Sequence, residues 1–221
     1  MIAVTRLMAL LIGYFCGCFP TGFLVGKSRG VDIRKHGSGN TGATNTLRTL
    51  GWGAAAITFF GDCAKTILAI LLASLLLRET GFEMTLLELY AGIGAILGHN
   101  FPFYFKFKGG KGIACTAGLA FALFPAAVPV CFIVFVLCIV LSKYVSLGSI
   151  MMAILLVIQI FVFNFYGILG VPETAVYEFD ALVLFLGVLA VFQHRSNIVR
   201  LFKGTENKLG QKAEIKKECE E

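Results

Sequence analysis

The sequence predicts an all-α fold, a polytopic bundle of membrane-spanning helices, from its composition and its long uncharged runs. Hydrophobic residues make up 57% of the 221 positions and charged residues only 14%, whereas a soluble domain carries about 25% charged residues. The mean hydropathy is +0.84. Residues 113–141 and 147–166 contain no charged side chain, and such runs are typical of bilayer spans.

Six apolar runs are the candidate spans, at residues 4–25, 52–77, 84–98, 113–141, 147–165 and 181–192. The first run resembles a secretory signal, because Arg6 precedes its apolar part. However, no small-residue cleavage site follows before Pro20 and Gly22. We therefore expect this run to be retained as the first span.

The connectors between the runs differ in charge. Basic residues occupy the first and third connectors, a later one and the segment after the last run: Lys27, Arg29, Arg34, Lys35, Arg48, Lys106, Lys108, Lys111, Lys143, Arg195, Arg200 and Lys203. Acidic residues cluster after the second run and before the last one: Glu79, Glu83, Glu88, Glu173, Glu178 and Asp180. Because cytoplasmic connectors are enriched in Lys and Arg, the basic connectors should be cytoplasmic and the acidic ones external.

This charge pattern decides how run 113–141 should cross the membrane. A single crossing would put the basic segments before and after it on opposite sides, whereas a turn near Pro125 gives two crossings and returns them to one side. Length is less decisive, because about 29 residues form a helix of about 43 Å and each half about 18–24 Å, against a core of about 30 Å. We therefore expect seven spans, with the N-terminus outside and the C-terminus cytoplasmic.

The chain should form one integral membrane domain over residues 1–208, followed by a charged tail, 209–221, that we expect to be disordered. The seven cysteines are odd in number and form no C-x-x-C pair, so we interpret them as small core residues. The net charge of +6 is spread over short connectors, which argues against nucleic acid as a partner.

Three polar segments interrupt the apolar pattern, and the first, residues 36–48, reads HGSGNTGATNTLR. Its glycines allow several backbone N–H groups to point at one anion, and Arg48 can offer a planar fork to a phosphate. The spacing also matches G-x-G-x-x-G, but the preceding VDIRK is not a buried strand, which disfavours a dinucleotide site. A flexible glycine-rich loop is the alternative interpretation.

The second segment, residues 98–114, reads GHNFPFYFKFKGGKGIA and places Lys111 among glycines at the start of an apolar run. A helix N-terminus with a lysine is an anion site, although the spacing is not that of a P-loop. Alternatively, the lysines only set the topology and meet lipid head groups. His99 fits a packing role and a site role equally well.

The third segment, residues 194–206, reads HRSNIVRLFKGTE. In a helix, His194 and Asn197 share one face, where imidazole and carboxamide can meet one substrate hydroxyl. A juxtamembrane anchoring stretch is the alternative.

Two further pairs of polar residues stand inside or beside the apolar runs. Asp62 and Lys65 are at positions i and i+3, which predicts a structural ion pair or support for a site, because lone charges in lipid are costly. Ser146 and Ser149 open another run, where serines usually cap helices.

Together, GSGNTGATNTLR, GHNFPFYFKFKGGKG and HRSNIVRLFKGTE resemble, in order and spacing, the three signature motifs of the bacterial acyl-phosphate-dependent glycerol-3-phosphate acyltransferase family. The resemblance implies transfer of a fatty acyl group from acyl phosphate to the sn-1 hydroxyl of glycerol 3-phosphate, giving lysophosphatidate (1-acyl-glycerol 3-phosphate) and phosphate in phospholipid biosynthesis. It implies no cofactor and no metal ion. The H-x-x-x-x-D motif of other glycerolipid acyltransferases is absent, because Thr41, Tyr104 and Val199 stand five residues beyond the three histidines.

The resemblance also implies roles for individual residues. The catalytic positions are His194, Asn197 and Lys111. The substrate-binding positions are Ser38, Gly39, Asn40, Thr44, Asn45, Arg48, Gly109, Gly110, Gly112, Ser149 and Glu206. Gln193 departs from the family pattern, which often has a basic residue before the histidine.

The resemblance implies glycerol 3-phosphate and a long-chain acyl phosphate as substrates, with supply of acyl phosphate by a separate enzyme as an option. It implies a bacterial cytoplasmic (inner) membrane location, contact with membrane lipid, and an active site at the cytoplasmic face. The acyl chain should enter laterally through a groove between spans, because each buried CH₂ of its about 14–18 carbons gains about 0.8 kcal/mol. A transporter or exchanger of phosphorylated metabolites is the alternative, disfavoured because the sequence has no internal repeat.

Overall fold

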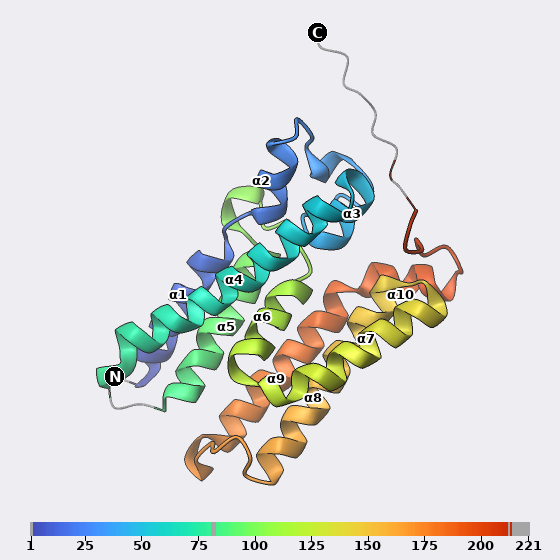
Figure 1. The fold of residues 1–221 in the computed structure, drawn as a ribbon. Helices are drawn as coiled ribbons and strands as arrows, with labels where there is room; N and C mark the ends of the chain where they lie inside the picture. The colour runs from blue at the N-terminus through green and yellow to red at the C-terminus, as the bar shows by residue number, and fades with distance from the viewer. Residues whose placement is uncertain (1, 81–82, 212, 214–221) are drawn as a thin grey trace.

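The structure is a computed structural model that describes residues 2–80, 83–211 and 213. The described residues form helices and no strand, which confirms the predicted all-α fold (Figure 1). The α-helices are α1 (Ile2–Gly17), α2 (Thr21–Lys27), α3 (Ala43–Leu50), α4 (Trp52–Leu77), α5 (Met84–Asn100), α6 (Ile113–Leu123), α7 (Val128–Ser142), α8 (Val145–Phe165), α9 (Glu173–Gln193) and α10 (Arg195–Phe202). Short 3₁₀ turns are present at Ile33–Lys35, Arg78–Thr80, Phe103–Phe105 and Pro125–Ala127.

Five helical segments of the described chain are long and apolar enough to cross a bilayer: residues 2–27, α4, residues 125–142, α8 and α9. Helices α5 and α6 have 17 and 11 residues, which is shorter than the about 20 residues that a span usually needs. The molecule is therefore an integral membrane helical bundle. The number of seven spans and the orientation of the termini stay predictions.

The uncharged run 113–141 contains the predicted turn near Pro125. Helix α6 ends at Leu123, and α7 begins at Val128. A proline disfavours helical geometry at the residue before it, and Phe124 has left the helix, with φ −131° and ψ 51°. Helices α6 and α7 then run in opposite directions (Figure 1).

Two other predicted runs have different limits as helices. The run 4–25 is interrupted between α1 and α2, because Pro20 has no N–H to continue the helical hydrogen bonds. The last run, predicted over 181–192, is part of a longer helix that begins at Glu173. The prediction was too short there because it excluded the acidic residues before position 181.

Those acidic residues lie in α9 rather than in a connector, and two of them, Glu178 and Asp180, have partners on other helices. Glu178 in α9 contacts Arg6 and accepts a hydrogen bond of 2.6 Å from the Tyr90 hydroxyl. Neighbouring Asp180 accepts one of 2.8 Å from Asn164. A paired carboxylate can stay within an apolar helix, because its partners replace the water that it loses.

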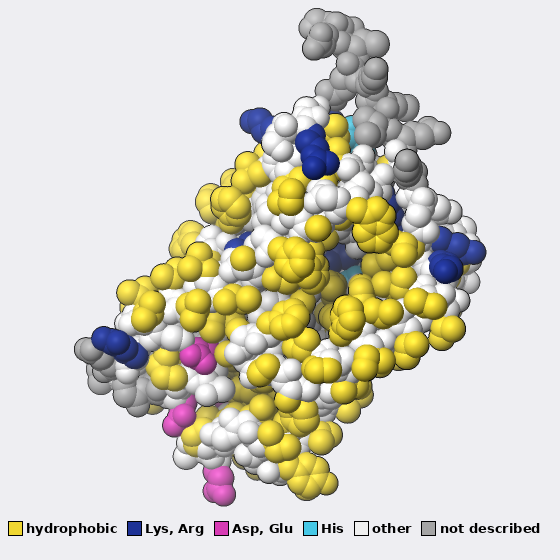
Figure 2. Space-filling model, viewed as in Figure 1, with side chains coloured by type: hydrophobic (Ala, Val, Ile, Leu, Met, Phe, Trp, Pro, Cys, Tyr) yellow, Lys and Arg dark blue, Asp and Glu magenta, His cyan; other side chains and the backbone are white. Residues whose placement is uncertain are grey.

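Helices α1 and α5 pack at backbone contact through glycines. A Cβ atom on Gly13 would lie 2.0 Å from the Ala91 carbonyl oxygen, and one on Gly98 would lie 2.1 Å from the Tyr14 carbonyl oxygen. Small residues of this kind let membrane helices approach closely. By contrast, large side chains such as Phe132 and Leu141 are exposed on the outside, and hydrophobic side chains cover much of the face in Figure 2.

The basic connectors meet at the end of the bundle that carries α2, α3 and α10 (Figure 1). The Asn40 amide donates to the Gly109 carbonyl oxygen at 3.4 Å, which joins the first connector to the third. Lys111 donates to the Asn197 side chain, which joins the third to the last. The backbone N–H of Leu209 donates to the carbonyl oxygen of residue 143 at 2.7 Å.

Residues 207–211 and 213, the C-terminal strap, continue from this end of the bundle. The Ala213 N–H donates to the Arg48 carbonyl oxygen at 3.0 Å, and the Arg48 side chain donates to the Asn207 carbonyl oxygen at 3.4 Å. The domain boundary at residue 208 stays a prediction. Residues 212 and 214–221 of the predicted tail lie outside the described residues.

Candidate active site

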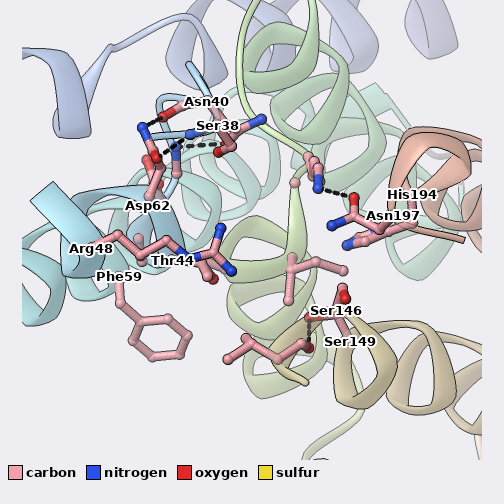
Figure 3. A pocket seen from close by; sticks show the side chains of 18 of the residues that line it. Ser38, Asn40, Thr44, Arg48, Phe59, Asp62, Ser146, Ser149, His194 and Asn197 are labelled. Atoms are coloured by element: carbon pink, nitrogen blue, oxygen red, sulfur yellow. Dashed lines mark hydrogen bonds between the residues drawn. The ribbon is translucent and has the colours of Figure 1, made fainter. Parts of the chain in front are cut away.

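The three polar segments line one cavity of about 120 Å³. In Figure 3, side chains of the first segment face those of the third across it. Predicted site residues that line the cavity are Ser38, Asn40, Thr44, Asn45, Arg48, Lys111, Gly112, Ser149, His194, Asn197 and Glu206. Gly39, Gly109 and Gly110 belong to the same loops but do not line the cavity.

Asn45 shapes the loop of the first segment. Its Nδ2 shares two N–H groups among the carbonyl oxygens of Ile33 (2.9 Å), His36 (3.1 Å) and Asn40 (2.9 Å). Its Oδ1 accepts from the Ser38 N–H at 2.8 Å. The side chain is only 2% exposed. These side-chain hydrogen bonds all join the loop backbone, which gives Asn45 an organising role.

The loop leads into the N-terminus of α3. Gly37 and Gly39 have φ of 59° and 69°, a region that glycine adopts without steric cost. Gly42 precedes the helix, and its cap contains no side-chain hydrogen bond. The first N–H groups of α3 lie beside Thr44 at the cavity wall, and such free N–H groups favour an anion.

Lys111 enters the cavity from the loop before α6. Gly112 caps that helix with φ 82°, and the Lys111 ammonium donates to Asn197 Oδ1. Burial lowers the pKa of Lys111 to about 8, and the positive charges of Arg200 and Arg48 add to the effect, while Glu206 opposes it. The ammonium form is thus less favourable here than in water, because little solvent remains around it.

His194 ends α9 and faces the cavity while being only 3% exposed. Its Nδ1 lies 2.8 Å from the Ala190 carbonyl oxygen. Because a carbonyl can only accept, Nδ1 carries the proton, and in the neutral ring Nε2 is then an acceptor. Burial and the charge of Lys111 lower the pKa of His194 to about 4, so the ring is neutral at pH 7.

Glu206 is a hub of hydrogen bonds at the cavity wall. Its Oε1 accepts from Ser146 Oγ (3.1 Å) and Asn197 Nδ2 (2.8 Å), and its Oε2 accepts from Arg200 Nε (2.7 Å). Burial alone would raise the pKa of Glu206, but these hydrogen bonds and the Arg200 charge hold it below its usual value. The Glu206 carboxylate therefore fixes the position of Asn197 and already accepts three hydrogen bonds from the protein.

Some residues at the cavity were not among the predicted site residues. Phe59, Asp62, His99, Phe135 and Ser146 all line it. The predicted ion pair is present, with Lys65 Nζ 2.8 Å from Asp62 Oδ1. By contrast, Ser149 Oγ donates to the carbonyl oxygen of residue 145 in its own helix at 2.9 Å, as expected for a serine in the first turns of a helix.

An apolar groove of about 310 Å³ adjoins the polar cavity. It lies between α4, α6, α7 and α8, and its lining is hydrophobic apart from Thr116 and Cys131. Phe59, Ile113 and Phe135 line both spaces. Figure 2 shows a hollow ringed by hydrophobic side chains, with basic and histidine side chains visible inside. The structure thus contains a groove between helices of the kind that the sequence predicted.

Comparison with known proteins places these features in a family. The family model described as Glycerol-3-phosphate acyltransferase matches residues 7–204. The glycerol-3-phosphate acyltransferase of Thermoanaerobacter sp. (strain X514) is 42% identical over 210 residues, which cover 95% of this chain and 98% of the relative. That of Clostridioides difficile (strain 630) is 39% identical, with coverage of 92% and 95%.

Two crystal structures of PlsY (YgiH), an integral membrane glycerol 3-phosphate acyltransferase, share the fold. The glycerol 3-phosphate form has a TM-score of 0.78 and 34% identity, and the lysophosphatidic acid form has 0.76 and 33%. Each alignment covers 93% of this chain and 96% of the other. The resemblance of the three polar segments is confirmed at the level of the family, and the chain belongs to the glycerol-3-phosphate acyltransferase family of integral membrane enzymes.

Proposed function

We propose that the protein transfers a fatty acyl group from acyl phosphate to the sn-1 hydroxyl of glycerol 3-phosphate, giving 1-acyl-glycerol 3-phosphate and inorganic phosphate. One observation carries this proposal: a polar cavity with two cations shares three lining residues with an apolar groove. Lys111 and Arg48 line the cavity, and neither forms an ion pair with a described residue. Two phosphorylated substrates would supply the two missing anions.

The acidic groups of the cavity do not neutralise these cations. Glu206 is paired with Arg200 at 2.7 Å, and Asp62 is paired with Lys65 at 2.8 Å. Lys111 hydrogen-bonds to the neutral Asn197 amide and forms no ion pair with a described residue, which costs free energy in a buried site. This arrangement supports binding of doubly charged phosphates better than binding of a neutral substrate.

The position of each cation suggests which phosphate it holds. Lys111 and the start of α6 lie next to Ile113, a residue shared with the apolar groove, so they would hold the acyl phosphate. Arg48, Thr44 and the Ser38 loop lie across the cavity from His194 and Asn197 (Figure 3) and would hold glycerol 3-phosphate.

The apolar groove would take the acyl chain. Its members come from helices that face lipid, and Phe132 at its edge is 63% exposed. A chain can therefore slide in from the bilayer without passing through water, which would cost about 0.8 kcal/mol for each CH₂ exposed. The reacting carbonyl carbon would then lie near Phe59, Ile113 and Phe135, where the two spaces meet.

An acyl phosphate is already activated, so positioning and stabilisation of charge suffice for reaction. The glycerol hydroxyl oxygen would bond to the carbonyl carbon, the bond from that carbon to the phosphate oxygen would break, and the hydroxyl proton would go to a phosphate. His194 Nε2 and Asn197 would orient the hydroxyl. With a pKa of about 4, His194 is a weak base, whereas a phosphate monoester has a second pKa of about 6, so we assign the proton to substrate phosphate.

We further propose a bacterial cytoplasmic membrane location with the active site at the cytoplasmic face. The contacts between Asn40 and Gly109, between Lys111 and Asn197, and between Leu209 and residue 143 join four basic connectors at one end. Lys and Arg are enriched in cytoplasmic connectors. A soluble enzyme could deliver acyl phosphate at that face.

The test is phosphate release by the purified protein in lipid, given palmitoyl phosphate with and without glycerol 3-phosphate. We expect release that requires both substrates, an acyl group on the sn-1 oxygen by NMR, and no product from acyl-CoA. Lys111→Ala should abolish release, whereas Lys108→Ala, an exposed lysine of the same loop, should retain it. Well-folded protein without release would favour transport, which uptake of labelled glycerol 3-phosphate into vesicles would detect.

The role of His194 needs a separate variant. If His194 only orients the hydroxyl, His194→Gln should retain part of the turnover, because an amide can still accept a hydrogen bond. Complete loss of turnover in folded His194→Gln would instead assign the proton to the histidine.

A further inference from the structure

Three ionisable side chains form a buried cluster beside the active-site cavity. Asp62, Lys65 and His99 are 1%, 6% and 8% exposed. Lys65 Nζ lies 2.8 Å from Asp62 Oδ1, 2.9 Å from His99 Nδ1 and 2.8 Å from the Phe19 carbonyl oxygen. Lys65 thus forms an ion pair with Asp62 and hydrogen-bonds to the other two groups, and His99 Nδ1 itself lies 3.5 Å from Asp62 Oδ1. Burial of three such groups between membrane helices is costly and calls for a function.

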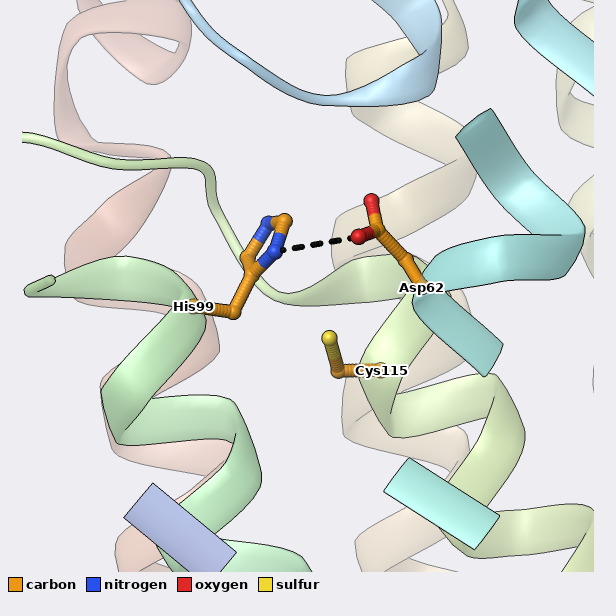
Figure 4. A group of neighbouring side chains, drawn as sticks. All are labelled: Asp62, His99 and Cys115. Carbon is orange, nitrogen blue, oxygen red and sulfur yellow. Dashed lines mark ion pairs between the residues drawn. The ribbon is translucent and has the colours of Figure 1, made fainter. Parts of the chain in front are cut away.

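A metal site is the first function to consider. One ligand atom from each of Asp62, His99 and Cys115 lies within 4.8 Å of the others (Figure 4). However, the Lys65 ammonium lies 2.8 Å from the carboxylate and 2.9 Å from the imidazole, beside the direct contact between Asp62 and His99. A metal ion there would meet a positive charge at hydrogen-bonding distance from its own ligands, which opposes binding. The Lys65 ammonium therefore already supplies the positive charge that a metal ion would bring to this cluster.

The second function to consider is support of the loop that carries Lys111. The His99 carbonyl oxygen accepts from the Gly110 N–H at 3.0 Å, and the Asn100 carbonyl oxygen accepts from the Gly109 N–H at 3.0 Å. The imidazole of His99 lies directly against Gly110, because a Cβ atom there would be 1.9 Å from Nε2. The loop thus rests on the end of α5 through its backbone and on the imidazole ring through Gly110.

We propose that His99 is a positioning residue for the acyl-transfer reaction. Its ring is held by Lys65 and Asp62 and fixes the position of the Gly110 backbone. That position in turn places the side chain of the next residue, Lys111, in the cavity. This inference rests on the proposed role of Lys111 in holding acyl phosphate. A displacement of about 1 Å in such a group can lower activity about 10²-fold. The activity gained by holding Lys111 in place can therefore offset the cost of burying the three ionisable side chains.

The charged pair has a defined part in this support. Without Lys65, the His99 ring would lose the donor at Nδ1 and keep only Asp62, at 3.5 Å, as a charged neighbour. Without Asp62, Lys65 would keep only the Phe19 carbonyl and the imidazole as acceptors. The pair therefore orients the ring, and the ring in turn orients the loop.

The test is a double-mutant cycle between His99 and Gly110, measured with the full-length protein in lipid. Gly110→Ala should lower kcat/KM about 10²-fold in the wild-type background, because its Cβ meets the imidazole. In the His99→Ala background the same change should cost less than about fivefold, because the ring is gone and neighbouring residues are not additive. Equal costs of Gly110→Ala in both backgrounds would overturn the proposal.

A second readout separates positioning from loss of folded protein. His99→Gln should raise the KM for palmitoyl phosphate more than the KM for glycerol 3-phosphate, because only the Lys111 loop is displaced. A change in the amount of folded enzyme lowers apparent kcat and leaves both KM values unchanged, and that result would also overturn the proposal. His36→Ala is the matched control, because the His36 side chain lines neither the cavity nor the groove.

The cycle also distinguishes this inference from the proposed function. If wild-type protein releases no phosphate from palmitoyl phosphate, then acyl phosphate is not the donor and the proposed function fails. If the wild type is active and the cycle is additive, only the role of His99 fails. The double variant Asp62→Asn with Lys65→Gln, which buries no lone charge, should fold and reproduce the selective rise in KM.

Discussion

The polar cavity and the apolar groove share three lining residues and have opposite construction. In the cavity, Glu206 accepts three hydrogen bonds and Lys111 and Arg48 each donate one. In the groove, hydrophobic side chains predominate and Phe132 at its edge is exposed to the surroundings. One space is thus held by directional contacts, and the other by shape alone.

This difference teaches how each space should respond to substitution. A hydrogen-bonded group has one correct geometry, and its loss leaves buried partners unsatisfied. A hydrophobic wall tolerates exchange of similar volumes and responds mainly when its volume changes. Substitutions should therefore lower activity most in the cavity and least at the edge of the groove.

The largest effect is expected for Glu206→Ala. The change removes the acceptor of Ser146, Asn197 and Arg200 together, so kcat/KM should fall about 10²–10³-fold, as for loss of a preorganised charge-stabilising group. Each buried donor left unsatisfied costs about 1–3 kcal/mol, so the Tm in detergent should also fall. Glu206→Gln keeps an acceptor oxygen, so its kcat/KM should lie between those of Glu206→Ala and the wild type. Wild-type activity in Glu206→Ala would show that the hydrogen bonds of Glu206 are not needed for the reaction.

The next effect is a pH limb set by Lys111. Because burial lowers its pKa to about 8, the ammonium is lost as the pH rises through that value, and kcat/KM should then fall about tenfold per pH unit. Bound phosphate stabilises the ammonium, so the limb in kcat should lie at higher pH. In Lys111→Arg the limb should disappear, because a guanidinium stays charged throughout this range. A limb that persists in that variant would have another origin.

A smaller and selective effect is expected in the groove. Ala117 lines it and is partly exposed, so Ala117→Phe should fill space that the acyl chain needs. We expect about a tenfold loss in kcat/KM with palmitoyl phosphate, the lower end of the discrimination that a hydrophobic pocket can give. With hexanoyl phosphate the loss should be slight. Equal losses for both donors would mean that the chain lies elsewhere.

The smallest effect is expected at the edge of the groove, for Phe132→Leu. Its ring is 63% exposed, and exposed substitutions usually change stability by less than about 0.5 kcal/mol. Activity with palmitoyl phosphate should stay within about twofold, as for a hydrophobic exchange at an exposed wall. A large loss of activity in Phe132→Leu would show that the edge of the groove tolerates substitution as poorly as the cavity.

The sequence predicted the all-α fold, the turn near Pro125 and most of the residues that line the cavity. These features depend on local properties, such as proline geometry, glycine-rich spacing and the hydropathy of a run. The limits of helices were less accurate where a charged residue is neutralised by a distant partner. Glu178 was placed outside its helix because nothing near it in sequence indicates Arg6, 172 positions away.

The structure adds contacts within the site that the sequence did not indicate. Asn45 and Glu206 hydrogen-bond to the protein itself, and their role in substrate binding stays a prediction. The contact between Lys65 and His99 joins residues 34 positions apart, and no local pattern predicts it. Spacing indicates which side chains share a helix face. The hydrogen-bond partners of each side chain depend on the tertiary structure.

The C-terminal strap has a practical consequence for engineering the protein. Its N–H groups at Leu209 and Ala213 are bonded to the carbonyl oxygens of residue 143 and Arg48. A fluorescent reporter or affinity tag fused directly after Glu206 would replace these contacts and leave Arg48 without its acceptor at Asn207. A fusion joined beyond residue 213 leaves every one of them in place, which makes that position the better attachment point for purification and imaging.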